Sequence, residues 1–480
     1  MGSLQLCPPL PPSLLRRRQP VCALSKHGQR LLRSLSAAAG DAAAADRLMR
    51  KFVASSPKSA ALDALSHLLP HPHLSSLALP LYAKIREAPW FRWNAKLAAD
   101  LIASLKKQGL TAESESLAAE AIARLGPRDR DVALLYCNLI DSLSELKSES
   151  GFDAYVSRLK QIVDGSSSAY VRRRGYGSMI KGLSEMGRPR EAESLMDEMR
   201  SRGIELSYFE VKAVAYGYGK LGLFDDMSRN IDKMDAQGFK IDTVCANMVL
   251  SSYGNSGDLS KMLPWLGRMK AAEIPFSIRT YNTVSNSCPT IMSLLRDPSS
   301  FPLSIEELDG VLDGEEEGVL VKELVDSPVL SEAMEWGPSE AKLDLHGMHL
   351  GSAYLIMLQW VEEMRCRLGG GEYVIPAEVT VVCGSGKHSA IRGESPVKQM
   401  VKAMLNRLRS PMRIDRRNVG CFVAKGRVLK NWLCTDSKGS ASRTSLPAMD
   451  RDSRRVELQG VECERKSSLR PSGTIEESCE

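Results

Sequence analysis

The chain has 480 residues, of which 43% are hydrophobic and 25% charged, and its formal net charge is +6. This length predicts two or three domains. No apolar run approaches the roughly 18 residues that a membrane-spanning helix needs, so we expect no membrane partner. The eleven cysteines form no CxxC pair, which argues against a zinc knuckle or a disulfide framework and favours a reducing compartment.

The N-terminal segment is predicted to be a targeting sequence. Its first forty residues contain six Lys and Arg, several prolines and no Asp or Glu. It lacks the apolar centre of a secretory signal, and this composition is typical of an organellar transit peptide, here assigned to residues 1–45. The tripeptide VCA at 21–23 is similar to plastid cleavage contexts, which favours the chloroplast over the mitochondrion. A merely disordered N-terminus is the alternative.

A period of 35 residues governs the middle of the chain. Three sets of residues are spaced 35 apart. They are helix-ending glycines, methionines of the second helix and turn residues: Gly187, Gly222 and Gly257; Met199, Met234 and Met269; Gly203, Gly238 and Glu273. Each unit contains a short apolar helix, a glycine that ends it, and an amphipathic second helix. Because a two-helix unit of this size cannot bury its apolar face alone, stacked units predict an all-α superhelical solenoid.

The clearest unit, GYGSMIKGLSEMGRPREAESLMDEMRSRGIELS, resembles a pentatricopeptide repeat, a 35-residue helical hairpin common in plant organelles. Repeats are assigned to 173–207, 208–242 and 243–277, and a fourth begins at 278 and loses the pattern after Asn286. Weaker units at 95–132 and 133–172 extend the predicted array to 95–287. Tetratricopeptide repeats, which have a period of 34 and bind peptides, are the alternative, and the strict 35 argues against them.

The resemblance implies single-stranded RNA as a partner, because the fifth and last residues of such a repeat face one base. Here these residues are Gly177 with Ser207, Lys212 with Asp242, Asn247 with Ser277, and Asn282 in the broken unit. Only the Asn247 and Ser277 pair combines an amide with a hydroxyl, whereas Lys212 is better suited to a phosphate. The array is therefore expected to bind RNA with little sequence selectivity, or to hold a protein as a scaffold.

Residues 288–340 are predicted to form an acidic linker with one or two short helices. The helical period ends here, and residues 305–340 hold twelve Asp and Glu against one Lys. A solvated spacer is the simpler interpretation, and a segment that masks the basic region beside it is the alternative.

Residues 342–433 alternate strand-like and helix-like segments, which predicts a small α/β two-layer domain after the solenoid and hence a multidomain chain. The motifs LDLHG and CGSGKHS resemble the small MutS-related (Smr) domain, which accompanies pentatricopeptide repeats in a plant organellar class. The resemblance implies nucleic-acid binding, with RNA endonuclease activity in some members.

Asp344 and His346 are the candidate catalytic residues because alternate residues of a strand share one face. Asp344 would orient His346, or hold a water or a divalent metal such as Mg²⁺, and His346 would act as general acid or base. A structural hydrogen bond that fixes the turn is the alternative.

The second motif and the basic run after it supply candidate phosphate ligands. They are Gly384, Gly386, Lys387, His388, Arg392, Arg413, Arg416 and Arg417. The spacing of a Walker A loop is absent, which argues against an ATP site. The family's usual Thr is here Cys383, which places catalysis in question. A solvated face is the alternative for the basic run.

Residues 434–480 show no periodicity and are predicted to be a disordered tail. Together these features predict an RNA-binding protein that acts in organellar RNA processing or stability. Two alternatives remain open: a non-catalytic factor that binds RNA or the ribosome, and a scaffold near the plastid nucleoid. Neither the enzymatic role nor a cofactor is fixed by the sequence.

Overall fold

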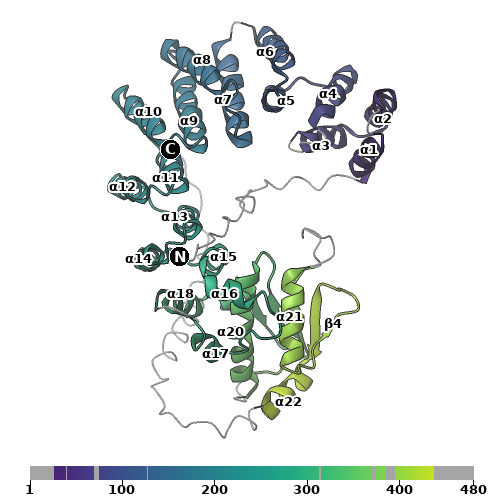
Figure 1. The fold of residues 1–480 in the computed structure, drawn as a ribbon, viewed down its shortest axis with the longest axis vertical. Helices are drawn as coiled ribbons and strands as arrows, with labels where there is room; N and C mark the ends of the chain where they lie inside the picture. The colour runs from purple at the N-terminus through teal and green to yellow at the C-terminus, as the bar shows by residue number, and fades with distance from the viewer. Residues whose placement is uncertain are drawn as a thin grey trace, which may run out of the picture. The chain divides into compact units, whose positions relative to one another are not determined.

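The computed structural model describes residues 26–38, 41–69, 75–126, 128–312, 315–369, 373–384 and 395–436. The predicted tail beyond residue 436, and the predicted transit peptide before residue 26, lie outside these residues. The chain divides into two compact units (Figure 1). The first consists of Met1–Pro289 and Gly314–Leu324, and the second of Thr290–Asp313 and Val325–Glu480. No helix within the described ranges is long and apolar enough to cross a membrane.

The first unit is built from helical hairpins. Its helices are α1 Lys26–Ala37, α2 Ala42–Ser55, α3 Lys58–Leu68, α4 Ala78–Glu87, α5 Ala95–Lys107, α6 Thr111–Leu125, α7 Asp129–Leu146, α8 Phe152–Gly165, α9 Ala169–Glu185, α10 Pro189–Ser201, α11 Tyr208–Lys220, α12 Phe224–Ala236, α13 Thr243–Asn255, α14 Leu259–Ala271, α15 Ile278–Ser287 and α18 Glu315–Val325. The first helices α5, α7, α9, α11, α13 and α15 pack one on the next in series. The predicted helical-repeat solenoid is confirmed.

The 35-residue period reflects both turns and core. Gly187, Gly222 and Gly257 follow the first helices with φ of 80°, 71° and 70°, a conformation that glycine adopts without a steric penalty. Met199, Met234 and Met269 are fully buried, one per second helix. Each position therefore recurs because one step of the solenoid repeats the same turn and the same packing contact.

The helical array starts well before residue 95. Helices α1 to α4 pack together, and Leu31 and Leu35 of α1 are buried. Residues 26–45 of the predicted transit peptide thus include all of α1 and the start of α2. Upstream repeats were hard to recognise because α7 has 18 residues and α9 has 17, against 13 in α11 and α13. Each extra helical turn adds about four residues to its repeat, so the glycines and methionines are no longer spaced 35 residues apart.

The interpretation of 288–340 as a linker with one or two short helices is wrong. The segment contains α16 Pro289–Leu294, α17 Ile305–Asp309, α18, α19 Val329–Ala333 and strand β1 Met334–Trp336. Leu320 and Leu324 of α18 are fully buried in the first unit. The Tyr281 hydroxyl donates to the Leu324 carbonyl, and Lys270 pairs with Glu323. The acidic residues misled the prediction, because three buried apolar residues, Leu320, Val321 and Leu324, suffice to pack α18 against the first unit despite the charges around them.

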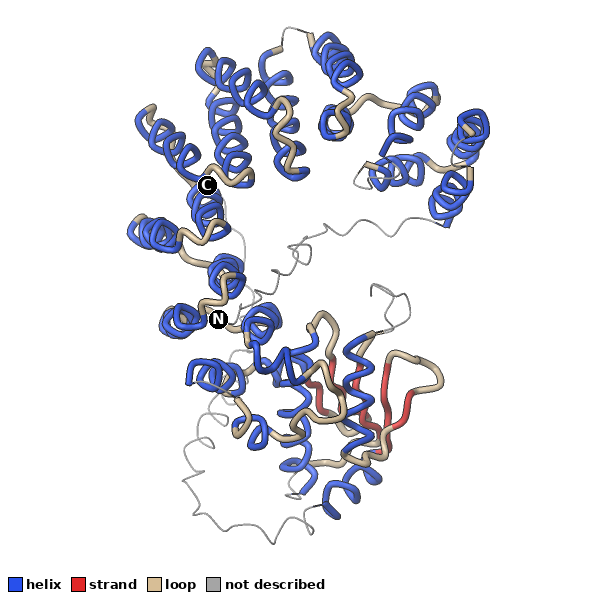
Figure 2. Tube along the Cα trace, viewed as in Figure 1, coloured by secondary structure: helices blue, strands red, loops and turns tan. Residues whose placement is uncertain are grey.

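The second unit contains a five-stranded sheet with the order β1-β2-β3-β5-β4 (Figure 2). Its other elements are β2 Glu340–Asp344, α20 Leu350–Gly369, β3 Glu378–Val382, α21 Pro396–Arg407, β4 Arg413–Ile414, β5 Cys421–Lys425 and α22 Gly426–Asp436. Strands β2 and β3 are parallel, with Asp344 opposite Val382, whereas β5 is antiparallel to both β3 and β4. Leu343, Val381 and Phe422 form one buried row across the sheet, and α20 packs against α21 and α22.

Candidate nucleic-acid interface

The last residue of each clear repeat caps the helix that follows it. Ser207, Asp242 and Ser277 directly precede α11, α13 and α15. The Asp242 carboxylate accepts a hydrogen bond from the Cys245 backbone N–H at 2.6 Å. The two serine hydroxyls accept from backbone N–H groups of their helices at 3.3 and 3.4 Å. The first turn of a helix leaves its N–H groups without backbone partners, so the predicted base-reading positions are also structural caps.

The fifth residue of two repeats lies against this cap. Asn247 Nδ2 donates to Ser277 Oγ at 3.2 Å, and Lys212 Nζ lies 3.7 Å from Asp242 Oδ1. The structure therefore brings together both pairs that the repeat pattern predicts. Asn247 is only 2% exposed, and its Oδ1 accepts no hydrogen bond from any described residue. The side chain would have to turn outward before it could read a base edge.

The fifth residues of the other two repeats are Gly177 and Asn282. A Cβ at Gly177 would lie 3.2 Å from Glu210 Oε1, and Glu210 Oε2 accepts the backbone N–H of Ser207 at 2.7 Å. A buried glutamate thus occupies the place that a fifth side chain would take. Asn282 lies half-buried on α15. Gly177 contributes no reading group, as the sequence predicts.

The Asp242 carboxylate is held by three donors. Besides the helix N–H, it accepts the Tyr208 hydroxyl at 2.5 Å and faces Lys212, whose ammonium also lies 4.9 Å from the Tyr208 ring centroid. Burial raises the pKa of Asp242, but the Tyr208 hydrogen bond, the N–H bond and the Lys212 charge outweigh it, so the pKa stays below its usual value. The carboxylate is therefore ionised at neutral pH, and the Lys212 charge beside it is largely compensated.

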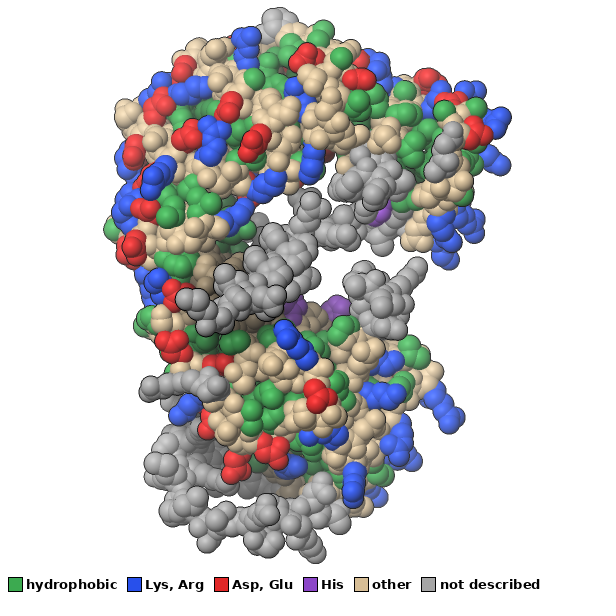
Figure 3. Space-filling view, viewed as in Figure 1, with side chains coloured by type: hydrophobic (Ala, Val, Ile, Leu, Met, Phe, Trp, Pro, Cys, Tyr) green, Lys and Arg blue, Asp and Glu red, His purple; other side chains and the backbone are tan. Residues whose placement is uncertain are grey.

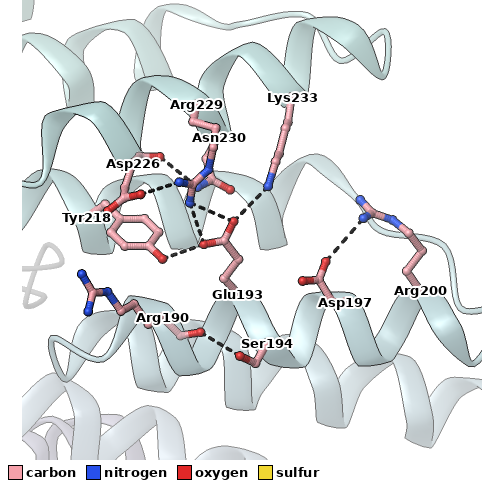
Figure 4. Close-up of polar contacts among 10 residues, drawn as sticks. All are labelled: Arg190, Glu193, Ser194, Asp197, Arg200, Tyr218, Asp226, Arg229, Asn230 and Lys233. Atoms are coloured by element: carbon pink, nitrogen blue, oxygen red, sulfur yellow. Dashed lines mark hydrogen bonds and ion pairs between the residues drawn. The ribbon is translucent and has the colours of Figure 1, made fainter.

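The cations of the second helices are bound between repeats rather than left free. Glu193 of α10 accepts hydrogen bonds from the Tyr218 hydroxyl at 2.6 Å, from Lys233 at 2.9 Å and from Arg229 at 3.0 Å (Figure 4). Burial raises the pKa of Glu193, yet these donors outweigh it and hold the pKa below 4.5. Arg268 of α14 pairs with Asp232 and Asp235 in the same manner. These cations form ion pairs that join neighbouring repeats of the solenoid.

The predicted catalytic pair lies at the end of β2, where the chain turns. The His346 backbone N–H donates to Asp344 Oδ1 at 2.8 Å, and Gly347 follows with φ of 80°. Asp344 thus makes the hydrogen bond that fixes the turn, which was the structural alternative. The His346 side chain is exposed, and a Cβ at Gly384, at the end of the adjacent β3, would lie 3.9 Å from its Nδ1. The two motifs therefore meet at one edge of the sheet.

The rest of the second motif lies outside the described residues, namely Gly386, Lys387, His388 and Arg392. Cys383 before it is buried, and burial raises the pKa of its thiol to about 12, so it is not a thiolate at neutral pH. Among the described residues, no three His, Cys, Asp or Glu side chains are placed to hold a metal ion. Since Asp344 is engaged in its own turn, the described side chains do not fit a Mg²⁺ site.

The predicted basic run differs from the solenoid in forming no ion pair among the described residues, although Arg407 donates to the Phe301 carbonyl. Hydrogen bonds from Ser299 chiefly lower the pKa of Asp297, and the Arg407 charge adds to this effect. Residues 395–436 contain ten Lys and Arg against Asp415 and Asp436. The ten are Lys398, Lys402, Arg407, Arg409, Arg413, Arg416, Arg417, Lys425, Arg427 and Lys430. No ion pair joins any of them to a carboxylate of the described chain. In Figure 3, blue side chains gather on the side of this unit that carries α21 and β4, whereas red and blue intermingle over the solenoid helices.

Comparisons with known proteins identify the family. A model of the PPR repeat matches residues 175–204, which cover most of α9 and α10. The pentatricopeptide repeat-containing protein At2g17033 of Arabidopsis thaliana is 54% identical over 427 residues, which is 88% of this chain and 84% of that protein. The chain belongs to the pentatricopeptide repeat proteins. A second Arabidopsis thaliana member, At1g74750, is 34% identical over 94 residues, or 19% of this chain and 10% of that protein.

Solved pentatricopeptide repeat proteins are more distant. The crystal structure of PPR10 from maize matches 80% of this chain with 16% identity and a TM-score of 0.38, and this chain covers half of that one. PPR10 in complex with an 18-nt psaJ RNA element matches 52% of this chain and 39% of its own length with 15% identity and a TM-score of 0.33.

One recurring feature of these pentatricopeptide repeats escaped the sequence analysis. Phe209 and Val244 are the second residues of α11 and α13, and they are 74% and 43% exposed. They are 35 residues apart, and exposed Arg279 of α15 continues the spacing. Each therefore lies two residues after a capping residue of the predicted pairs. An apolar residue after a Ser or Asp cap, recurring with the period, is the signal that would have revealed them.

Proposed function

We propose that this pentatricopeptide repeat protein binds RNA and acts in organellar RNA processing or stability. The repeat unit takes single-stranded RNA, and the C-terminal unit contacts RNA phosphates. The observation that carries the proposal is the exposed apolar side chain that recurs with the 35-residue period at Phe209 and Val244, two residues after the polar helix caps Ser207 and Asp242. Unpaired bases stack on such side chains whatever their sequence, while neighbouring polar groups contact base edges or phosphates.

The C-terminal unit supports the second half of the proposal. Its two motifs resemble those of a small MutS-related domain, and no ion pair to a described carboxylate holds Arg413, Arg416 or Arg417, which leaves these side chains available for phosphates. Arg413, Arg416 and Arg417 are exposed. We place the protein in the chloroplast because its first forty residues, which contain no Asp or Glu, are typical of a transit peptide. Import of a fluorescent protein fused to this segment tests the location.

Truncation of Phe209 tests RNA binding by the repeats. We expect Phe209→Ala to weaken the binding of a single-stranded RNA by roughly tenfold, since stacking contributes about 1–3 kcal/mol per base. Fluorescence anisotropy of a labelled RNA with the full chain measures this. Leu221→Ala is the matched control, because Leu221 is also half-exposed but lies just beyond the other end of α11. Equal RNA affinities of the parent, Phe209→Ala and Leu221→Ala would contradict the proposal that the repeats bind RNA through Phe209.

Endonuclease activity is a second candidate function, and the exposed imidazole of His346 beside the Gly384 turn favours it. The imidazole would take a proton from a ribose 2′-hydroxyl or give one to the leaving oxygen. We expect the parent to cut RNA and His346→Ala to lose cutting while it binds RNA equally well. His349→Ala, three residues further on, is the control and should still cut. If the parent binds RNA and leaves it intact, the C-terminal unit is an RNA-binding domain without catalytic activity, as expected of a factor in organellar translation or assembly.

A further inference from the structure

The β4–β5 hairpin of the C-terminal unit holds two arginines on a well-ordered tip. Ile414 pairs with Phe422 in the ladder, and the Asp415 N–H donates to the Cys421 carbonyl at 3.0 Å. Inside the loop, the Arg417 N–H donates to Asp415 Oδ1 at 2.9 Å. The Gly420 N–H donates to Asn418 Oδ1 at 3.1 Å. These bonds fix the backbone while leaving the side chains of Arg416 and Arg417 exposed.

The hairpin belongs to a surface with cations but without exposed aromatic rings. Within the described residues 395–436, Phe422 is buried and Trp432 is half-buried, with its Nε1 donating to the Leu408 carbonyl at 3.1 Å. The large apolar side chains exposed there are aliphatic: Ile414, Val419 and Val428. The repeat unit shows the reverse combination, since Tyr170, Phe209 and Tyr216 are exposed while Arg229, Lys233 and Arg268 of the second helices are paired with carboxylates.

These two combinations suit different forms of RNA. A single strand offers unpaired bases, and proteins hold it mainly by stacking aromatic rings on them. A duplex hides its base faces and presents two rows of phosphates, so free cations on a rigid element are what it requires. Arginine is suited to this contact because its planar fork donates two parallel hydrogen bonds to a phosphate.

We infer that the C-terminal unit binds base-paired RNA, with Arg416 and Arg417 of the β4–β5 hairpin contacting the phosphates. The inference rests on the proposed function, since it assigns the form of RNA to the same unit. It goes further in predicting that the RNA bound by this protein contains a stem as well as an unpaired segment. The stem is read by its shape and charge, because the hairpin offers arginines to phosphates and no aromatic ring to a base.

The test removes the two charges from the full chain. We expect Arg416→Gln/Arg417→Gln to weaken binding of a blunt RNA duplex of about 20 base pairs by at least tenfold. The slope of log affinity against log salt should fall by about two, because each phosphate contact contributes about one. Binding of an unpaired oligouridylate of the same length should change by less than about twofold. Far-UV circular dichroism shows whether the variant is folded.

A matched variant controls for net charge. Arg190→Gln/Arg200→Gln removes two exposed arginines from α10, both drawn in Figure 4, and should leave duplex binding within about twofold. Equal losses in the two double variants would overturn the inference, as would a loss confined to the unpaired RNA. A chain that binds the oligouridylate but not the duplex overturns the inference alone. A chain that binds neither RNA overturns the proposed function with it.

Discussion

Leu324→Ala should lower the free energy of unfolding of the repeat unit by about 2–5 kcal/mol. Leu324 is fully buried, and it lies in α18, within the segment whose composition resembles a spacer. The substitution removes buried methyl groups but keeps the backbone carbonyl that accepts the Tyr281 hydroxyl. Urea unfolding followed by far-UV circular dichroism measures the loss.

Val319→Ala is the matched control for this prediction. Val319 lies on the same helix and is 41% exposed, so its truncation should cost less than about 0.5 kcal/mol. Equal midpoints for the parent and Leu324→Ala would mean that α18 is not docked in solution and that the segment behaves as a spacer after all. A large effect at Leu324 alone would establish α18 as the element that closes the solenoid after α15.

Glu193→Ala should destabilise the repeat unit by about 2 kcal/mol. Glu193 is the one carboxylate shared by Tyr218, Arg229 and Lys233, so its removal leaves Lys233 without an acidic partner among the described residues and Arg229 with Asp226 alone (Figure 4). The value lies below the 3–5 kcal/mol of a fully buried pair because the arginine and lysine side chains are 48% and 42% exposed. Thermal or urea unfolding at neutral pH checks it.

The effect of Glu193 should also depend on pH. Its pKa in the folded chain is lowered from 4.5, so its contribution is fully present above about pH 4.5 and is lost as the pH falls through the folded pKa. The stability difference between the parent and Glu193→Ala should therefore shrink on acidification below pH 4.5. Asp197→Ala, one turn along α10 and joined only to Arg200, should change stability by less than about 0.5 kcal/mol at any pH. A difference that stays constant with pH would exclude the ion-pair origin.

The repeat fold could be predicted because its determinants are local. The helix-ending glycines recur in the three clear repeats, and a positive φ at those positions needs no distant contact to be recognised. The buried methionines recur for the same reason, since each step repeats one packing contact. Helices α1 to α4 escaped prediction because the extra turns of α7 and α9 weaken the period upstream of residue 173, and because the composition of the N-terminus predicts a transit peptide over residues 1–45.

The candidate site was predictable only in part. The period correctly placed Lys212 with Asp242 and Asn247 with Ser277, because the fifth residue of one first helix and the cap of the next are neighbours in any such stack. It could not show that the Asn247 side chain is buried, since burial depends on how closely α13 and α15 pack. The strand pattern placed Asp344 and His346 at the end of β2, yet the turn bond to the His346 N–H, and not a side-chain pairing, engages the carboxylate.

The amino-acid sequence by itself determined the repeat, its caps and turns, and the location of positive and negative charge along the chain. Only the tertiary structure decided which of these charges are free. Arg229 and Lys233 meet Glu193 across a repeat joint 36 and 40 residues away in sequence, whereas Arg416 and Arg417 form no ion pair with a carboxylate in the described part of the chain. Charge composition is a local property, but compensation of a charge requires a partner within a few ångströms. Folding alone brings such partners together, and it thereby separates the cations that hold the solenoid from those that form no ion pair among the described residues.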